Sequence, residues 1–546
     1  MRGLRRGGLA ILGWMRDGWR WLALGAGAFV LSAAVRWNWL HAHFGALVTG
    51  VLPDDAFYYF EIAHRVWAGQ GVTFDGTAPA TGLHLLWLGL LLPLFAFHPA
   101  GSPAPVVASL WLATALMAVA STLVARITWK WTKRWDLAVV TGACLTVNPW
   151  VVRESLNGLE TALALAFLAA SVLGLLRYTE SPSRPRAMAL AGLLVLTLLA
   201  RSDALVILAP ACGVLLLRRA WWRDAAVVAG GAGAGVAALS LLNWVRTGAF
   251  LQSSATAVPW LFHANWSRLH PEASAAQAHE HGWDVFLRAL DSTEVFLGEP
   301  LVHLLLLCAA GLVVTGVGHA VSRRSPSLDS ALPAALLVGL AAGLLALHFV
   351  HGYVRWLPRP WYFVPCALLV CLAPAALARL WQGGGAARAS LAGVLLLGAT
   401  TLTMGRDLER LRVQWDVPSY PWQAEMLATG LALVERLPAD AVVGAFNAGI
   451  IAYVTPQTVV NLDGVVNEDA ARALKRHALW AYMRERHMEY LADYPAMWRP
   501  SEFIHCTWPY WGGSPPLPQE LFRVDFPGLG WPSPSDPIVV ARLPES

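Results

Sequence analysis

Long apolar runs recur along the first three quarters of the chain and stop near residue 404. Short polar segments, several of them rich in arginine, separate these runs. An apolar helix of about 20 residues crosses the hydrocarbon core of a bilayer, and shorter helices cross it with local thinning of the bilayer. The pattern predicts eleven membrane spans, at residues 20–37, 105–125, 137–150, 159–176, 187–200, 204–217, 225–244, 300–318, 331–350, 361–379 and 389–404.

One further apolar run, residues 83–97, is not counted among the spans. It contains Pro93 and is shorter than the ~20 residues that a spanning helix needs. We expect this run to lie along or dip into the outer leaflet without crossing it. Residues 38–104 then form a large first loop on the outer face.

The region after residue 404 has mixed polar sequence with short apolar runs. An amphipathic helix is expected over residues 421–437, and helix-prone sequence extends from 468 to 493. Short buried strands are expected at residues 441–446, 458–462 and 538–543. This alternation predicts a small α/β domain with a mostly parallel sheet. The chain therefore divides into a membrane domain, 1–404, and a C-terminal domain, 405–546.

Two turn sequences follow the first two expected strands. Asn447-Ala448-Gly449 opens a short helix, whose amides could bind an anion, although a plain turn is the simpler interpretation. Asp463-Gly464 is also interpreted as a turn.

Composition and charge agree with the membrane assignment. Hydrophobic residues make up 56% of the chain and charged residues 14%, against about 25% charged in soluble proteins. Basic clusters mark cytoplasmic loops, so we expect the N-terminus inside and the C-terminal domain outside an inner, multi-pass membrane protein. The net charge of +5 is explained by those loops and does not indicate nucleic-acid binding.

Asp54 and Asp55 stand together on an aromatic, helix-competent segment of the first loop. Carboxylates beside hydrocarbon are costly to desolvate, so they are kept where they take a proton, bind a cation or meet a polar substrate. We interpret the pair as the chemical centre of a membrane enzyme. The alternative is that Asp54 only caps the helix that begins at Asp55.

The other expected outer loops carry arginines and carboxylates, and together they could deprotonate a hydroxyl while holding a phosphate. The candidates are Arg153, Glu154, Glu160, Arg201, Arg355 and Arg359. In the simpler interpretation Arg201 pairs with Asp203, and Arg355 and Arg359 are interfacial anchors beside tryptophans.

Histidines and cysteines give weaker signals. His41, His43 and His84 could join the two aspartates around a divalent metal, but their spacing matches no metal motif and non-ligand roles are favoured. The six cysteines show no CxxC pair or zinc spacing, and packing is their simplest role.

Several of these segments, taken in order, resemble one family. The motifs are Pro53-Asp54-Asp55-Ala56-Phe57-Tyr58-Tyr59, Thr81-Gly82-Leu83-His84, Arg153-Glu154-Ser155-Leu156-Asn157-Gly158-Leu159-Glu160, Arg201-Ser202-Asp203 and Tyr353-Val354-Arg355-Trp356-Leu357-Pro358-Arg359. They look like loops of the GT-C glycosyltransferases related to the protein O-mannosyltransferases and the lipid A aminoarabinose transferase. Residues 444–449 and 460–467 are similar to the C-terminal domain of that group.

The resemblance implies a GT-C-like polytopic α-helical protein with about eleven spans and an extracytoplasmic α/β domain. It implies a sugar transferase with a polyprenyl-phosphate sugar as donor and a glycan, lipid or protein acceptor. By position, the base is Asp55 or Asp54, and we favour Asp55, with Asp54 as cap. The second acidic residue is Glu154 or Glu160.

The donor phosphate is expected near some of the four arginines, Arg153, Arg201, Arg355 and Arg359. Several relatives carry a lysine or arginine where this chain has His84, so His84 is the fifth residue considered for the donor phosphate. A divalent metal is a further possible cofactor. Two other functions are considered, a lipid or oligosaccharide transporter or flippase, and a membrane-anchored binding protein.

Overall fold

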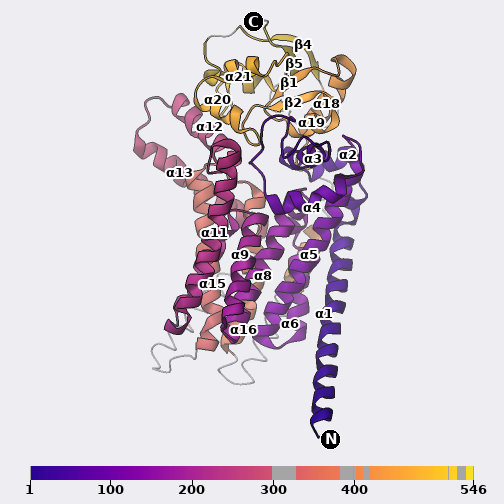
Figure 1. Cartoon of the computed structure of the whole chain (residues 1–546), viewed down its shortest axis with the longest axis vertical. Helices are drawn as coiled ribbons and strands as arrows, with labels where there is room; N and C mark the ends of the chain where they lie inside the picture. Colours follow the sequence, from indigo (N-terminus) through magenta and orange to yellow (C-terminus); the bar gives the residue numbers. More distant parts are fainter. Residues whose placement is uncertain are drawn as a thin grey trace.

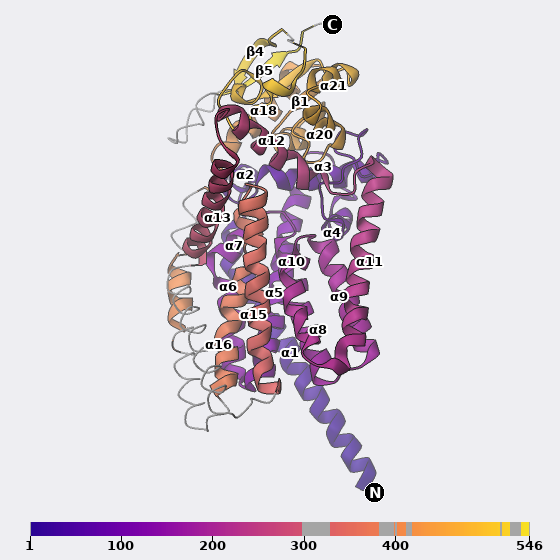
Figure 2. The same ribbon diagram turned by 90° about the vertical axis from the view of Figure 1, so that its left-hand side faces the viewer.

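The chain forms a helical bundle with a small α/β domain at one end, and the N-terminus lies at the opposite end (Figure 1). The computed structural model describes residues 2–297, 328–381, 398, 401–410, 418–513, 516–524 and 537–544. Helices of the bundle run side by side beneath the C-terminal domain in both views (Figures 1 and 2). The architecture is the expected combination of apolar helices and a small sheet domain.

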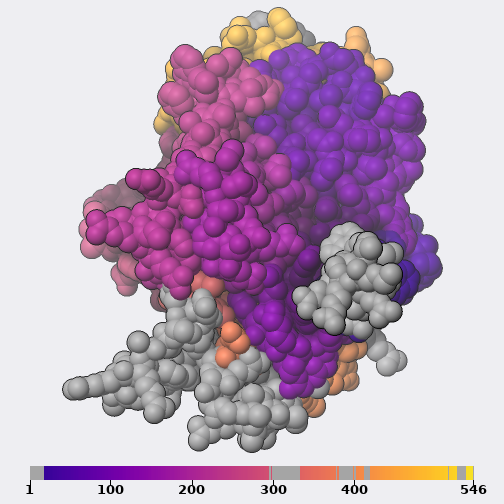
Figure 3. Space-filling model, turned by 60° about the horizontal axis from the view of Figure 1, so that its bottom comes forward, coloured from indigo at the N-terminus to yellow at the C-terminus, as the bar shows by residue number. Residues whose placement is uncertain are grey.

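The bundle is built from helices that match the apolar runs. They are α1 (Arg2–Leu40), α5 (Pro103–Thr132), α6 (Trp135–Val147), α7 (Pro149–Ser155), α8 (Thr161–Glu180), α9 (Arg184–Ala200), α10 (Ala204–Cys212), α11 (Trp222–Thr247), α15 (Leu328–His348) and α16 (Cys366–Trp381). Seen from its lower end, α8–α11 (magenta) pack beside the violet first part of the chain (Figure 3).

Nine of the eleven expected spans fall on helices within the described residues. By length and composition, five of the described helices could each cross a membrane, and the bent pair α6 and α7 would make a sixth. The expected span at 300–318 and most of that at 389–404 lie outside the described residues. The total of eleven stays a prediction.

The first loop folds into three helices, α2 (Phe44–Gly50), α3 (Asp54–Trp67) and α4 (Leu85–Phe95). The run expected not to cross the membrane is α4, whose 11 residues extend only about 16 Å. It buries Trp87, whose indole donates a hydrogen bond to the carbonyl of Gly158. This helix is too short to span the ~30 Å hydrocarbon core.

The C-terminal domain is a five-stranded sheet with helices. Its elements are α18 (Gln423–Arg436), β1 (Val442–Ala445), α19 (Gly449–Val454), β2 (Thr458–Asn461), α20 (Glu468–Lys475), α21 (Leu479–Glu485), β3 (Tyr490–Asp493), α22 (Pro495–Trp498), β4 (Gln519–Val524) and β5 (Ile538–Arg542). The strand order is β2-β1-β3-β5-β4. A helical segment over residues 401–410 crosses the expected domain boundary.

The sheet was expected to be mostly parallel, and half of its strand pairings are parallel. Strand β1 pairs in parallel with β2 and β3, whereas β5 pairs antiparallel with β3 and β4. Strand β3 lies inside the range expected to be helical, because its four residues, Tyr490–Asp493, are too few to show a periodicity that separates strand from helix.

The first loop and the C-terminal domain pack closely. A β-carbon on Gly82 would lie 1.8 Å from the carbonyl oxygen of Val465, so only glycine allows this approach. The loop between α7 and α8 also packs closely on the first loop. Its Gly158 has a φ of +71°, and a β-carbon there would lie 2.9 Å from a side-chain atom of Ala56 on α3. Helix α12 (Ser253–Leu269) covers another side of the junction between the first loop and the C-terminal domain, and α13 (Ala275–Leu297) lies alongside residues 349–354 (Figure 2).

Candidate active site

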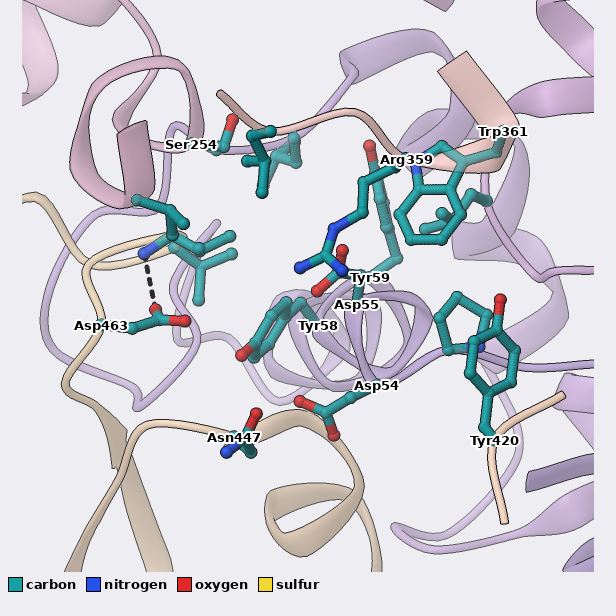
Figure 4. A pocket seen from close by; sticks show the side chains of 18 of the residues that line it. Asp54, Asp55, Tyr58, Tyr59, Ser254, Arg359, Trp361, Tyr420, Asn447 and Asp463 are labelled. Atoms are coloured by element: carbon teal, nitrogen blue, oxygen red, sulfur yellow. Dashed lines mark hydrogen bonds between the residues drawn. The ribbon is translucent and has the colours of Figure 1, made fainter. Parts of the chain in front are cut away.

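A cavity of about 320 Å³ lies where the first loop, the turn after α15 and the C-terminal domain meet. Its walls come from α3, from residues 357–362, and from the ends of β1 and β2 (Figure 4). The candidate residues Asp54, Asp55, His84, Glu160, Arg201 and Arg359 all line it. The fold therefore brings together groups from four separate loops.

Asp55 is in the first turn of α3 and faces the cavity (Figure 4). Its carboxylate makes no hydrogen bond to another described residue. Burial raises the pKa of Asp55, the nearby guanidinium of Arg359 lowers it in part, and the carboxylate of Glu160 raises it. A half-buried carboxylate without partners is available to take a proton.

Asp54 points the other way, into the C-terminal domain. Its two carboxylate oxygens accept hydrogen bonds from the amides of Gly449 at 3.1 Å and Ile450 at 2.7 Å. These are the first amides of α19, where the helix dipole favours a negative charge. Burial raises the pKa of Asp54 to about 7, although the two amides oppose this shift.

The expected cap of α3 by Asp54 is wrong. Helix α3 begins at Asp54 itself, its N-cap residue is Pro53, and no side chain caps it. Asp54 instead binds the start of a helix 395 residues away in the sequence. The anion that the Asn447-Ala448-Gly449 turn was considered to bind is thus a side chain of the same protein.

Gln423 strengthens this junction. Its side-chain oxygen accepts from the backbone amide of Asp54 at 2.8 Å, and its amide nitrogen donates to the carbonyl of Leu52 at 2.6 Å. The start of α3 is therefore bound to the C-terminal domain through Gln423 of α18 and through the first amides of α19.

Glu160 is the centre of a buried hydrogen-bonded cluster. It accepts from Arg201 at 2.7 Å and from the hydroxyl of Tyr59 at 3.1 Å. Arg201 also makes a two-pronged pair with Asp203, at 2.7 and 2.8 Å, as its simpler interpretation expects. His84 lies 3.4 Å from Glu160, and burial lowers the pKa of its imidazole. Arg201 and both carboxylates of this cluster have hydrogen-bond partners within it, and the cluster forms one wall of the cavity.

Three candidate residues do not line the cavity. Arg153 and Glu154 pair with each other at 2.9 Å on α7. Arg355 donates to the carbonyl of Ser254 at 2.8 Å and contacts His351. Of the two glutamates considered as a second acidic residue, Glu160 is the one that faces the cavity.

Arg359 is the lining arginine without a charged partner at ion-pair distance among the described residues. Its guanidinium lies 6.0 Å from the ring centre of Trp361 and reaches toward Asp55 (Figure 4). The contact with Trp361 fits the anchor interpretation, but the open guanidinium can also bind a phosphate that enters the cavity.

The C-terminal domain adds Asn447, Asp463 and His505, which sequence reasoning did not select. Burial raises the pKa of Asp463 to about 7, and burial lowers that of His505 to about 3. The position of Asn447 and Asp463 in the sequence could have marked them as site residues. Each follows the carboxyl end of a parallel strand, where α/β domains bind ligands.

The histidines of the first loop make contacts with other residues. His43 accepts a hydrogen bond from the amide of Ala46 and caps α2, and His41 stacks on Trp37. The described residues contain no group of three His, Cys, Asp or Glu side chains placed to hold a metal ion.

Asp54→Ala is expected to loosen the C-terminal domain from the first loop. A hydrogen bond to a charged group contributes about 1.5–3 kcal/mol, so amides at the start of α19 should exchange hydrogen roughly tenfold faster or more. Hydrogen–deuterium exchange of peptides covering residues 447–454 measures this. Asp440→Ala, at an exposed position of the same domain, is the control. Equal exchange in Asp54→Ala and wild type would contradict the contact.

The whole fold is similar to solved structures. ArnT from Cupriavidus metallidurans bound to undecaprenyl phosphate matches at 11% identity over 96% of this chain and 98% of that chain, with a TM-score of 0.54. The oligosaccharyltransferase AglB from Archaeoglobus fulgidus, in complex with an inhibitory peptide and dolichol-phosphate, matches at 12% identity over 88% and 70%, with a TM-score of 0.51.

Comparisons of the sequence alone identify one family model and no curated relative. Residues 414–527 match a family model described as a domain of unknown function, DUF8728, and no curated protein matches the sequence. The structural matches confirm the expected combination of a helical membrane domain and a small C-terminal sheet domain: the chain shares the fold of ArnT and AglB.

Proposed function

We propose that this protein is a membrane glycosyltransferase that moves a sugar from a polyprenyl-phosphate donor to an acceptor hydroxyl. The observation that carries the proposal is that Asp55 and Arg359 line the same cavity beside the apolar bundle, and among the described residues neither side chain has a hydrogen-bond or ion-pair partner. The solved structures of the same fold have undecaprenyl phosphate or dolichol-phosphate bound, which supports a donor of that class.

In the proposed reaction the acceptor oxygen attacks the anomeric carbon from the side opposite the phosphate, and the configuration inverts. Asp55 takes the hydroxyl proton as the new carbon–oxygen bond forms. The bond from the anomeric carbon to the phosphate oxygen breaks, and polyprenyl phosphate leaves with the electron pair. Arg359 stabilises the charge that develops on the departing phosphate.

The buried cluster of Glu160, Arg201 and Tyr59 has a positioning role in this proposal. The hydroxyl of Tyr59 accepts from the amide of His84 at 2.8 Å while donating to Glu160. The cluster thereby joins α3 to the segment before α4 and keeps Asp55 aimed at the cavity. We place the N-terminus in the cytoplasm and the C-terminal domain outside, with eleven spans in the inner membrane.

The test uses the purified protein in proteoliposomes with radiolabelled undecaprenyl-phosphate sugars. An envelope fraction from a host without the protein serves as the acceptor pool. We expect transfer of label into that pool from at least one donor, and a product with the opposite anomeric configuration. A parallel reaction with EDTA tests the need for a divalent metal. If no donor is consumed, the proposed function is wrong.

Activity is expected to fall on the acid side at a higher pH than an exposed aspartate would give. The base acts only when ionised, and burial raises the pKa of Asp55 above the usual value of about 3.9. As the pH falls through this raised pKa, the fraction of active enzyme falls with it. The dependence of kcat/KM on pH measures this, and an acid limb centred near pH 4 would contradict it.

A further inference from the structure

The carboxyl ends of two neighbouring parallel strands open into the cavity. Asn447 comes two residues after β1 and Asp463 two residues after β2. Ala445 and Asn461 are register partners, so equal offsets from these strand ends place the two residues at the same edge of the sheet. In open α/β sheets this edge is where ligands bind. Figure 4 shows both residues on the cavity wall opposite Arg359.

Asp493 fixes which way the Asn447 amide faces. One carboxylate oxygen of Asp493 accepts from the backbone amide of Asn447 at 2.8 Å, and the other accepts from the side-chain nitrogen at 2.9 Å. A buried carboxylate that already accepts backbone amides can only pair with the nitrogen of the Asn447 side chain. The side-chain oxygen of Asn447 is left to accept hydrogen bonds from the cavity.

Asp463 is held equally firmly. Its Oδ1 accepts from the amide of Val465 at 2.8 Å, and the carbonyl of Val465 accepts from the hydroxyl of Ser253 at 2.7 Å. The side chain of Asn461 accepts from the amide of Gly464 at 3.1 Å and closes the turn. Both residues therefore present acceptor oxygens in fixed positions, and neither position is used by the base or by Arg359.

We propose that Asn447 and Asp463 bind two neighbouring hydroxyls of the acceptor, which is a carbohydrate, and so aim a third hydroxyl at Asp55. The inference rests on the proposed function and names the acceptor class for the same cavity. It assigns the C-terminal domain a direct part in substrate binding.

The chemistry of this wall favours a carbohydrate over a peptide. Sugar hydroxyls rotate freely and donate to two adjacent acceptor oxygens. A peptide backbone brings one carbonyl acceptor for every amide donor, and carbonyls facing these oxygens would stay unpaired at a cost of about 1–3 kcal/mol each. The volume of about 320 Å³ is at the small end for ligand sites and suits a compact polar group.

The test compares wild type with Asp463→Asn in the proteoliposome assay. Asparagine can keep the bond to the amide of Val465 but replaces the second oxygen by a donor, so the fold is retained and the charged acceptor for the hydroxyl is lost. The acceptor pool is divided into portions pre-treated with periodate, which cleaves neighbouring hydroxyls, with protease, or with neither. Asn447→Ala is the second variant, and Asp440→Asn, at an exposed acid of the same domain, is the control.

We expect periodate, and not protease, to remove acceptor activity from the pool. At about pH 8, above the raised pKa of Asp463, Asp463→Asn should raise the KM for the acceptor roughly 10- to 100-fold, as for a lost hydrogen bond to a charged group, while the KM for the donor stays within about threefold. Asn447→Ala should act in the same direction. A merely structural role would move both KM values together.

Other results overturn the inference in distinct ways. Protease-sensitive acceptor activity with periodate resistance would identify a protein acceptor. An unchanged acceptor KM in both variants, with normal transfer by wild type, would remove these residues from acceptor binding while leaving the proposed function intact. Failure of wild type to use any donor would instead overturn the proposed function, and this inference with it.

Discussion

Asp55→Asn is expected to lower kcat for sugar transfer by about 10²–10⁴-fold, the contribution typical of a positioned general base. Asparagine has nearly the same shape, and the carboxylate makes no hydrogen bond to a described residue, so the fold should not change. The loss would therefore report proton transfer. Single-turnover transfer from the labelled donor measures it, with the KM for the donor determined in parallel.

Asp54→Asn is the matched control, because it makes the same chemical change one residue away. Its oxygen can still accept one of the two α19 amides, so we expect a much smaller loss of kcat. If Asp54→Asn abolished transfer while Asp55→Asn kept more than about a tenth of wild-type activity, the assignment of the base would be reversed.

Arg359→Gln is expected to lower kcat by about 10²–10³-fold, as when one preorganised donor to a developing anion is removed. A second effect separates this residue from a surface anchor. The guanidinium of Arg359 lowers the pKa of Asp55, so its removal should move the acid limb of kcat/KM to higher pH. The pH profile of the variant measures that shift.

Arg355→Gln is the comparison for Arg359. It lies on the same segment, but it binds the carbonyl of Ser254 and does not line the cavity. We expect a modest effect on kcat and no shift of the acid limb. If the two variants behave alike, the cavity arginine is no more than an interfacial anchor.

The local pattern of the sequence was enough for most of the architecture. Hydrophobic runs located the described helices of the bundle, and one short run with a proline, predicted not to cross the membrane, forms the 11-residue helix α4. Strands β1, β2 and β5 were expected within one or two residues. Strand β3 was missed because its four residues, all buried, have no alternation to read.

The contacts within the site were harder to predict from local sequence patterns, because they join residues that are far apart in the sequence. Candidate residues in the first loop, at Glu160, at Arg201 and at Arg359 were brought into one cavity as the common outer face implied. The role of Asp54 was misjudged, since its partner amides are 395 and 396 residues away and no local pattern encodes them. Asp463 was interpreted as a turn residue, and it is both a turn residue and part of the cavity wall.

Asp54 and Asp55 are consecutive in α3, so the contact with the C-terminal domain and the proposed proton transfer depend on neighbouring residues. One residue fastens the C-terminal domain above the cavity and the next is the proposed base, so separation of the domain from α3 must disturb the aim of Asp55. Water enters most easily when the domain is loosened. We therefore expect Asp55 to be misaligned whenever the loosened domain admits water to the cavity. Water would then not be activated by the base, and hydrolysis of the donor would stay slow.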